Sequence, residues 1–259
     1  MNPGTATVTA ALAPAGTVLD APALVAISHG TSSPQGQRAV AGLVEAVARA
    51  SVVPVVPGHV DVEQPDVAAA LATLPPDRAA VIVPLLLSAG YHVHVDLVEE
   101  AADADHHVEI ARALGPDDRI VALLARRLAE AGLASGDAVV LGCAGSSDLR
   151  AVADCFEMAR RLGAVLDRPV SVGFISAAEP RLPEAVSVAR AEHPQARVLV
   201  STYLLAPGYF NDLAHAMAAD AVTDPLLVTD AAAPGELVDV VLDRYGEVAR
   251  RPLIGHSGA

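Results

Sequence analysis

The chain has 259 residues, of which 53% are hydrophobic and only 3% aromatic, and its formal net charge is −14. This length accommodates either one large α/β domain or two small ones. A composition rich in Ala, Val and Leu suits buried parallel strands covered by helices. The negative charge and the scarcity of aromatic side chains argue against nucleic acid as a partner.

Two features of the chain favour a reducing cytoplasm. Its cysteines, Cys143 and Cys155, are too few for a disulfide framework and too far apart for a CxxC pair. Residues 1–20 are rich in Ala, Thr, Pro and Gly but contain no basic residue, so we expect a flexible tail there and not a signal peptide. Residues 253–259, with His256, are expected to form a second tail. Because no apolar run reaches membrane-spanning length, we expect no membrane partner.

Short apolar runs alternate with Ala/Leu/Arg segments of helical period, which is the pattern of βα units around a parallel sheet. In the first half, strands are predicted over 23–28, 52–62, 79–87 and 119–124. Helices are predicted over 35–50, in a short stretch that begins at Pro65, after Gly90 and over 125–131.

The same plan starts again after residue 135. Residues 138–147 resemble 24–33, residues 169–180 resemble 55–65, and residues 198–209 resemble 81–91. Matched landmarks in one order predict an internal duplication. We therefore expect an α/β fold of two tandem domains, each a small parallel sheet flanked by helices, over 21–134 and 135–252. Since a duplication can replace a homodimer, we expect a monomer.

The two copies differ in their polar side chains. In this alignment the first copy has His29, Asp61, His92 and His94 where the second has Cys143, Ser176, Phe210 and Asp212. The scaffold repeats and the imidazoles do not. The polar groups of the first copy are therefore better explained by chemistry than by a need of the fold.

Three of these polar groups follow successive strands. His29 comes directly after the first strand, Asp61 lies at the end of the second and His92 follows the third. Ligands of open α/β sheets bind at the carboxyl ends of the strands, so we expect a site there. Neutral imidazole suits late first-row divalent metals, and a carboxylate can take protons or hold the ion. Two histidines leave coordination positions open, which fits a metal that must be handed on.

Neighbouring residues receive supporting roles. If a helix begins near Tyr91, His92 and Asp96 share a face, so that Asp96 can orient the imidazole. His94 then points elsewhere and is expected at the rim of the site. His106 and His107 lie in an acidic connection that is predicted to be a solvated loop.

Nucleotide and hydrolase motifs are missing from the sequence. The turn over 30–33 could bind phosphate at a helix N-terminus, but it lacks the Walker spacing and lysine. No GxGxxG follows the first strand, and no GxSxG elbow occurs. No ATP is therefore expected.

An ordered set of segments resembles a known family. The set consists of residues 28–31, 59–65, 84–87, 90–96 and 113–117. It is similar to the class II chelatases that insert cobalt, iron or nickel into sirohydrochlorin, in their two-domain form, over roughly residues 22–250. The resemblance implies a tetrapyrrole cleft between two lobes. It also implies that His29 and His92 bind the metal and accept protons, with Asp61 beside them.

The activity implied by the resemblance is that of a lyase, with Fe²⁺ for siroheme favoured as the metal substrate and Co²⁺ (cobalamin) or Ni²⁺ as alternatives. No permanently bound cofactor is implied. Many members carry an Arg soon after the HGT motif, where this chain has Ser32 and Ser33, so Arg38 is a candidate for the substrate carboxylates. The other expected substrate-binding residues are Thr31, Ser32, Gly90, Tyr91 and His94. The alternatives are a non-catalytic metal or tetrapyrrole carrier and a hydrolase that uses metal-activated water, for which we see no third ligand.

Overall fold

The computed structural model of the protein describes residues 21–88, 97–99 and 106–250. The predicted tails over 1–20 and 253–259 lie outside the described residues, as does most of the helix predicted after Gly90.

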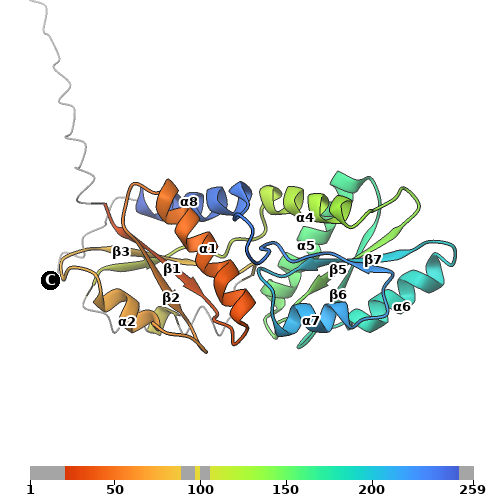
Figure 1. Ribbon diagram of the computed structural model, residues 1–259, viewed down its shortest axis with the longest axis horizontal. Helices are drawn as coiled ribbons and strands as arrows, with labels where there is room; N and C mark the ends of the chain where they lie inside the picture. Colours follow the sequence, from red (N-terminus) through yellow and green to blue (C-terminus); the bar gives the residue numbers. More distant parts are fainter. Residues whose placement is uncertain (1–20, 89–96, 100–105, 251–259) are drawn as a thin grey trace, which may run out of the picture.

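The described residues form two parallel sheets flanked by helices, which confirms the predicted duplicated α/β fold (Figure 1). The first sheet has the strand order β2-β1-β3-β4 and consists of β1 (Ala23–Ser28), β2 (Val55–His59), β3 (Ala80–Pro84) and β4 (Val108–Ile110). The second has the equivalent order β6-β5-β7-β8 and consists of β5 (Ala138–Cys143), β6 (Val170–Phe174), β7 (Val198–Tyr203) and β8 (Ala221–Val222). The helices are α1 (Pro34–Ala50), α2 (Val67–Ala72), α4 (Asp118–Glu130), α5 (Leu149–Leu166), α6 (Leu182–Glu192), α7 (Tyr209–His215) and α8 (Gly235–Ala249).

Local sequence explains the first βα unit. Every residue of β1 is buried, as its uninterrupted apolar run predicts for a strand inside a parallel sheet. Ser33 then caps α1 by accepting a hydrogen bond from the Gly36 amide, and Pro34 occupies the first turn, where its missing N–H costs nothing. Pro57 is tolerated within β2 because β2 is an edge strand.

The strand predicted over 119–124 is wrong, because these residues belong to helix α4. The fourth strand is instead β4, shortly after the loop that carries His106 and His107. Asp117 caps α4, and its apolar residues follow helical spacing, with Ile120, Leu124 and Leu128 buried on one face. A run of five apolar residues fits either a buried strand or one side of a helix, and the helix extends on both sides of it.

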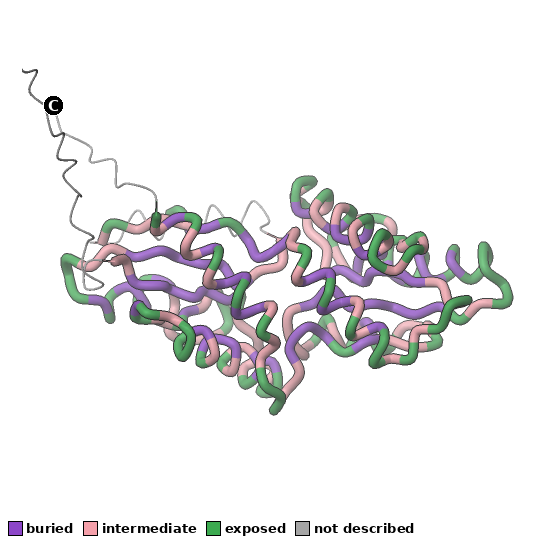
Figure 2. The backbone as a smooth tube through the Cα atoms, turned by 90° about the horizontal axis from the view of Figure 1, so that it is seen from above, coloured by how far each residue is buried: buried purple, intermediate pink, exposed green. Residues whose placement is uncertain are grey.

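Each sheet is completed by a helix from the other half of the sequence. Helix α4 packs against α5 and β7, whereas α8 packs against α1 and β3. We call the first sheet with α1, α2 and α8 the first lobe, and the second sheet with α4, α5, α6 and α7 the second lobe. Figure 2 shows the buried strands inside each lobe and exposed residues around them. One cluster of buried apolar side chains, from Leu24 to Val248, includes residues of both lobes, so the exchange joins their cores.

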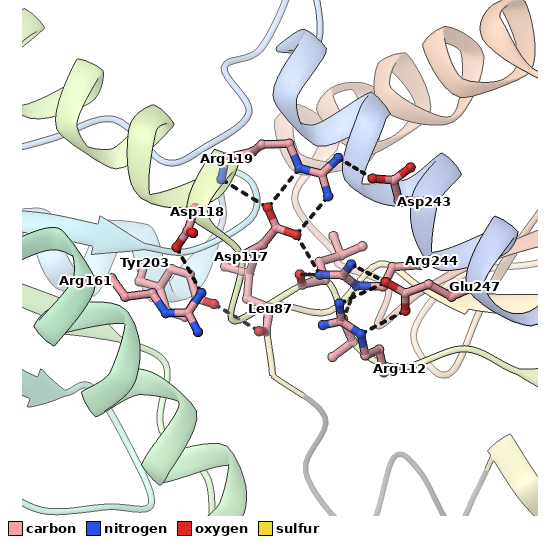
Figure 3. Close-up of polar contacts among 12 residues, drawn as sticks. Leu87, Arg112, Asp117, Asp118, Arg119, Arg161, Tyr203, Asp243, Arg244 and Glu247 are labelled. Atoms are coloured by element: carbon pink, nitrogen blue, oxygen red, sulfur yellow. Dashed lines mark hydrogen bonds and ion pairs between the residues drawn. The ribbon is translucent and has the colours of Figure 1, made fainter. Parts of the chain in front are cut away.

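A polar cluster fixes α8 to the first lobe (Figure 3). The guanidinium of Arg244, in a residue only 1% exposed, donates to the carbonyl oxygens of Ala113 (2.9 Å) and Leu114 (2.6 Å). It also donates to the carboxylate of Asp117 (2.9 Å), which Arg119 contacts as well. Burial raises the pKa of Asp117, but these hydrogen bonds outweigh it and hold the pKa at about 2, below the ordinary 3.8.

This lowered pKa predicts an acid-labile contribution to stability. Because the pKa of Asp117 is lower in the folded state, its stabilisation is complete above pH 3.8 and is lost as the pH falls towards about 2. We expect the unfolding free energy of Asp117→Asn to depend less on pH across this window than that of the wild type. Urea titrations at several pH values measure this, and parallel pH profiles would contradict it.

None of the helices in the described part of the chain is long and apolar enough to cross a membrane.

Candidate metal site at the junction of the lobes

The carboxyl edges of the two sheets meet at the junction between the lobes. The Tyr203 hydroxyl, at the end of β7, donates to the carbonyl oxygen of Leu87, just past β3, at 3.0 Å (Figure 3). On the other side of the junction, Gly36 near the start of α1 lies so close to the carbonyl oxygen of Pro207 that a Cβ atom would overlap with it. Side chains that follow β1, β2 and β3 therefore lie at the junction of the lobes.

His29 and Asp61 are neighbours at this edge, as their positions after β1 and β2 predict. The Asp61 amide donates to the His29 carbonyl oxygen at 3.0 Å, and both residues are exposed. Gly30 has a left-handed φ of +90°, and a Cβ atom at this position would overlap with the Asp61 carbonyl oxygen. Only glycine combines this φ with such close packing. Gly30 therefore holds the turn over residues 29–33, which we call the His29 turn, against Asp61.

The other predicted residues are only partly within the described chain. Thr31 lies in the turn, where its hydroxyl accepts from the Ser33 amide at 3.1 Å, and Ser32 is exposed. Arg38 is exposed on α1 and lies 3.4 Å from Asp230. Five predicted residues lie outside the described residues: Gly90, Tyr91, His92, His94 and Asp96.

Sequence reasoning missed a polar pair beneath the turn, His59 and Glu63, whose side chains are only 14% and 17% exposed. His59 Nδ1 lies 2.8 Å from the Ser28 hydroxyl oxygen and 3.8 Å from Glu63 Oε1, and Glu63 Oε1 also accepts from the Thr31 amide at 2.8 Å. The pair thereby ties the end of β2 to the turn that carries His29. The signal was the alternation of polar residues at 59, 61 and 63, of which only Asp61 was assigned a role.

Strand pairing corrects the alignment of the two repeats by one residue. Asp61 donates its amide proton to the carbonyl of His29, and Ser176 donates to that of Ala144. The counterpart of His29 is therefore Ala144, and Cys143 corresponds to Ser28. Apolar strands of similar composition match almost equally well after a slip of one residue, which is why the sequence alone misaligned them. The second repeat still lacks the imidazole, and Ser176 still corresponds to Asp61.

The repeats offer a matched test of the turn. Gly145, the counterpart of Gly30, has a φ of +97° and the same close packing, against the Ser176 carbonyl oxygen. We expect Gly30→Ala and Gly145→Ala to lower the unfolding free energy by similar amounts, about 1–3 kcal/mol each. Only Gly30→Ala is expected to abolish metal binding at His29, because only that turn carries an imidazole. Calorimetric titration with Co²⁺ and urea unfolding measure the two effects, and equal metal affinity in both variants would contradict the assignment.

The described residues contain no closed metal site. Among residues 21–88, 97–99 and 106–250, no three His, Cys, Asp or Glu side chains lie together so that they could hold an ion. Among the described residues, His29 and Asp61 offer one imidazole and one carboxylate at this edge, and an ion held by these two groups would keep coordination positions free for exchange.

A cavity of about 350 Å³ opens at the same junction. Pro84 and Leu86 at the end of β3 line it from the first lobe, and Arg150 and Asp154 of α5 line it from the second. Arg112 also lines it and forms a bidentate ion pair with Glu247 of α8 (2.9 and 3.0 Å). Guanidinium groups on its wall suit an anionic ligand.

A family model and several solved structures match the chain. The model of the CbiX family matches residues 23–131 and again 138–244. SirB from Bacillus subtilis with Fe³⁺ has a TM-score of 0.72 at 20% identity, with 89% of this chain and 96% of SirB covered. No curated protein sequence matches the chain.

Two further structures share the fold. The sirohydrochlorin chelatase SirB from Bacillus subtilis subspecies spizizenii, in complex with cobalt, has a TM-score of 0.69 at 18% identity and covers 90% of this chain and 97% of its own. DR2241 from Deinococcus radiodurans, a multi-domain protein with structural similarity to chelatases, has a TM-score of 0.64 at 18% identity, with coverages of 90% and 56%.

Proposed function

Because the chain belongs to the CbiX family, we propose that it is a chelatase that inserts a divalent metal ion into a sirohydrochlorin-type tetrapyrrole. The observation that carries this proposal is the pairing of His29 with Asp61 at the carboxyl edge of the first sheet only. The family membership confirms the resemblance noted in the sequence. The SirB structures with Fe³⁺ and with cobalt support a metal ion as the substrate of this chain.

The reaction needs proton acceptors and an open metal site. Insertion replaces two pyrrole N–H protons by one divalent ion, so two protons must leave the macrocycle. We assign His29 and His92 to hold the incoming ion, because imidazole binds such ions and can also accept a proton near neutral pH. Asp61 lies beside His29 and assists proton removal or ion capture. Asp96 is assigned to orient His92.

Substrate carboxylates need cationic partners in a protein with a charge of −14. Arg38 and Arg112 lie on α1 and just past β4, and both already contact carboxylates, of Asp230 and Glu247 respectively. A carboxylate of the substrate can take the place of these exposed partners at little cost, since exposed ion pairs contribute about 0–1 kcal/mol. We assign Thr31, Ser32, Gly90, Tyr91 and His94 to the remaining rim of the substrate site.

Iron is the metal that we favour, for siroheme formation, with cobalt as the alternative. Both lobes belong to one chain, so we propose that the protein acts as a monomer. The free, buried thiols of Cys143 and Cys155 fit the reducing cytoplasm that we propose as its location.

Anaerobic absorbance assays with sirohydrochlorin and Fe²⁺, Co²⁺ or Ni²⁺, each offered separately, test the proposal. We expect metallation faster than the protein-free rate and more than one product per protein molecule. A single equivalent of product would favour the alternative, a non-catalytic metal or tetrapyrrole carrier. No acceleration with any of the metals would refute the proposed reaction.

A further inference from the structure

Two exposed aromatic rings stand at the start of α7 in the second lobe. Tyr209 is 71% exposed and Phe210 is 39% exposed, and their ring centroids are 5.9 Å apart. The whole chain contains only four Tyr, three Phe and no Trp. Exposing two of so few rings side by side leaves a continuous apolar patch in contact with water, and such patches mark binding surfaces.

The aromatic pair lies beside the turn that carries His29. Gly208, which directly precedes Tyr209, is so close to this turn that a Cβ atom on it would lie 3.4 Å from Thr31 Oγ1 and 3.7 Å from Ser33 Cβ. Figure 1 shows the start of α7 next to the start of α1 where the two lobes meet. The start of α7, which carries the aromatic pair, therefore adjoins the turn after His29 at the junction of the lobes.

The two rings occupy positions that correspond to candidate site residues of the first repeat. Phe210 is the counterpart of His92, and Tyr209 is the counterpart of Tyr91. The second repeat thus has an apolar ring where the first has the imidazole of His92, and it has Ala144 and Ser176 where the first has His29 and Asp61. A lobe that lacks these imidazoles and this carboxylate at its carboxyl edge, and exposes two rings there, is suited to hold the flat face of a ligand.

We propose that Tyr209 and Phe210 form the apolar surface on which the tetrapyrrole macrocycle packs while the His29 turn meets it from the first lobe. This inference rests on the proposed function and assigns the second lobe a task within it. A tetrapyrrole has a broad apolar face and carboxylates at its periphery, so rings must contact the face and cations the periphery. Aromatic side chains give much contact area and fix a planar ligand by offset or edge-to-face packing.

The test measures the affinity of the full-length protein for metal-free sirohydrochlorin. The absorbance of sirohydrochlorin reports binding as the protein is titrated into it. Tyr209→Ala and Phe210→Ala are each expected to weaken binding roughly tenfold, the effect of removing one buried ring from a contact. Tyr209→Phe and Phe210→Tyr should bind as the wild type does. Phe156→Ala is the matched control, because Phe156 is 47% exposed on α5 and lines a separate groove along β6.

Two further measurements on the alanine variants are the affinity for Co²⁺ and the salt dependence of tetrapyrrole binding. Co²⁺ affinity measured without tetrapyrrole should be unchanged in the two alanine variants, since neither ring is a metal ligand. The loss of tetrapyrrole affinity should be the same at low and high salt, because apolar contact is not screened. If Tyr209→Ala and Phe210→Ala both bind the tetrapyrrole with wild-type affinity, this inference is overturned and the proposed function is not. A wild-type protein that neither binds nor metallates sirohydrochlorin overturns the proposed function itself.

Discussion

Replacement of His29 by alanine is expected to abolish catalysed metal insertion into sirohydrochlorin, with kcat lowered about a hundred- to ten-thousandfold, the usual contribution of a proton-transferring side chain. The fold should be unaffected, because His29 is exposed and the second repeat already has alanine, Ala144, at the same place. His92→Ala should have the same effect, since we assign it to the same ion.

The experiment separates chemistry from folding. Turnover of His29→Ala and His92→Ala is measured anaerobically with Fe²⁺ and Co²⁺, and urea unfolding is followed in parallel. His193→Ala is the control, since His193 is an exposed imidazole at the end of α6, away from the carboxyl edges. Near wild-type turnover in both site variants would show that the metal is held elsewhere.

Replacement of Arg244 by alanine is expected to lower the unfolding free energy by about 3–5 kcal/mol. The side chain is almost fully buried, and its loss leaves the carbonyl oxygens of Ala113 and Leu114 without this donor and the carboxylate of Asp117 with Arg119 as its remaining cationic partner. Buried groups without partners and a cavity of arginine size add to each other. Because α8 packs on the first lobe and one buried apolar cluster joins the two lobes, we expect both lobes to unfold in a single transition.

Arg112→Ala is the matched control for this second prediction. Arg112 and Arg244 both contact Glu247, but the side chain of Arg112 is 52% exposed, so we expect a loss of at most about 1 kcal/mol. Equilibrium urea unfolding, monitored by circular dichroism, compares the two variants. Similar losses in both would mean that Arg244 stabilises no more than an exposed ion pair does.

The structure shows which inferences can be made from one sequence. The strands β1, β5 and β7 and the helix α1 follow from apolar runs and from segments of helical period, because these signals act over a few neighbouring residues. The duplication was visible because apolar periodicity repeats with the fold. The helix α4 was misassigned in its first turns, since a short apolar run has no period of its own.

Only some residues of the candidate site could be predicted from the sequence. His29 and Asp61 stood out because each follows a strand end, and parallel strands bring their carboxyl ends together. His59 and Glu63 were missed because their role depends on contacts with Ser28 and Thr31, which are some thirty residues away in sequence. The match of His29 with Ala144 also needed the hydrogen bonds between strands.

The sequence by itself thus determined the class of fold, its repetition and the strand ends that carry polar groups, because local periodicity and turn residues encode these properties. Only the tertiary structure decided that α4 and α8 exchange lobes, that Arg244 is buried among carbonyl oxygens and that Tyr209 and Phe210 lie beside the His29 turn. These features arise from contacts between segments far apart in the chain. Their energies depend on which surfaces meet, and no window of neighbouring residues contains that information.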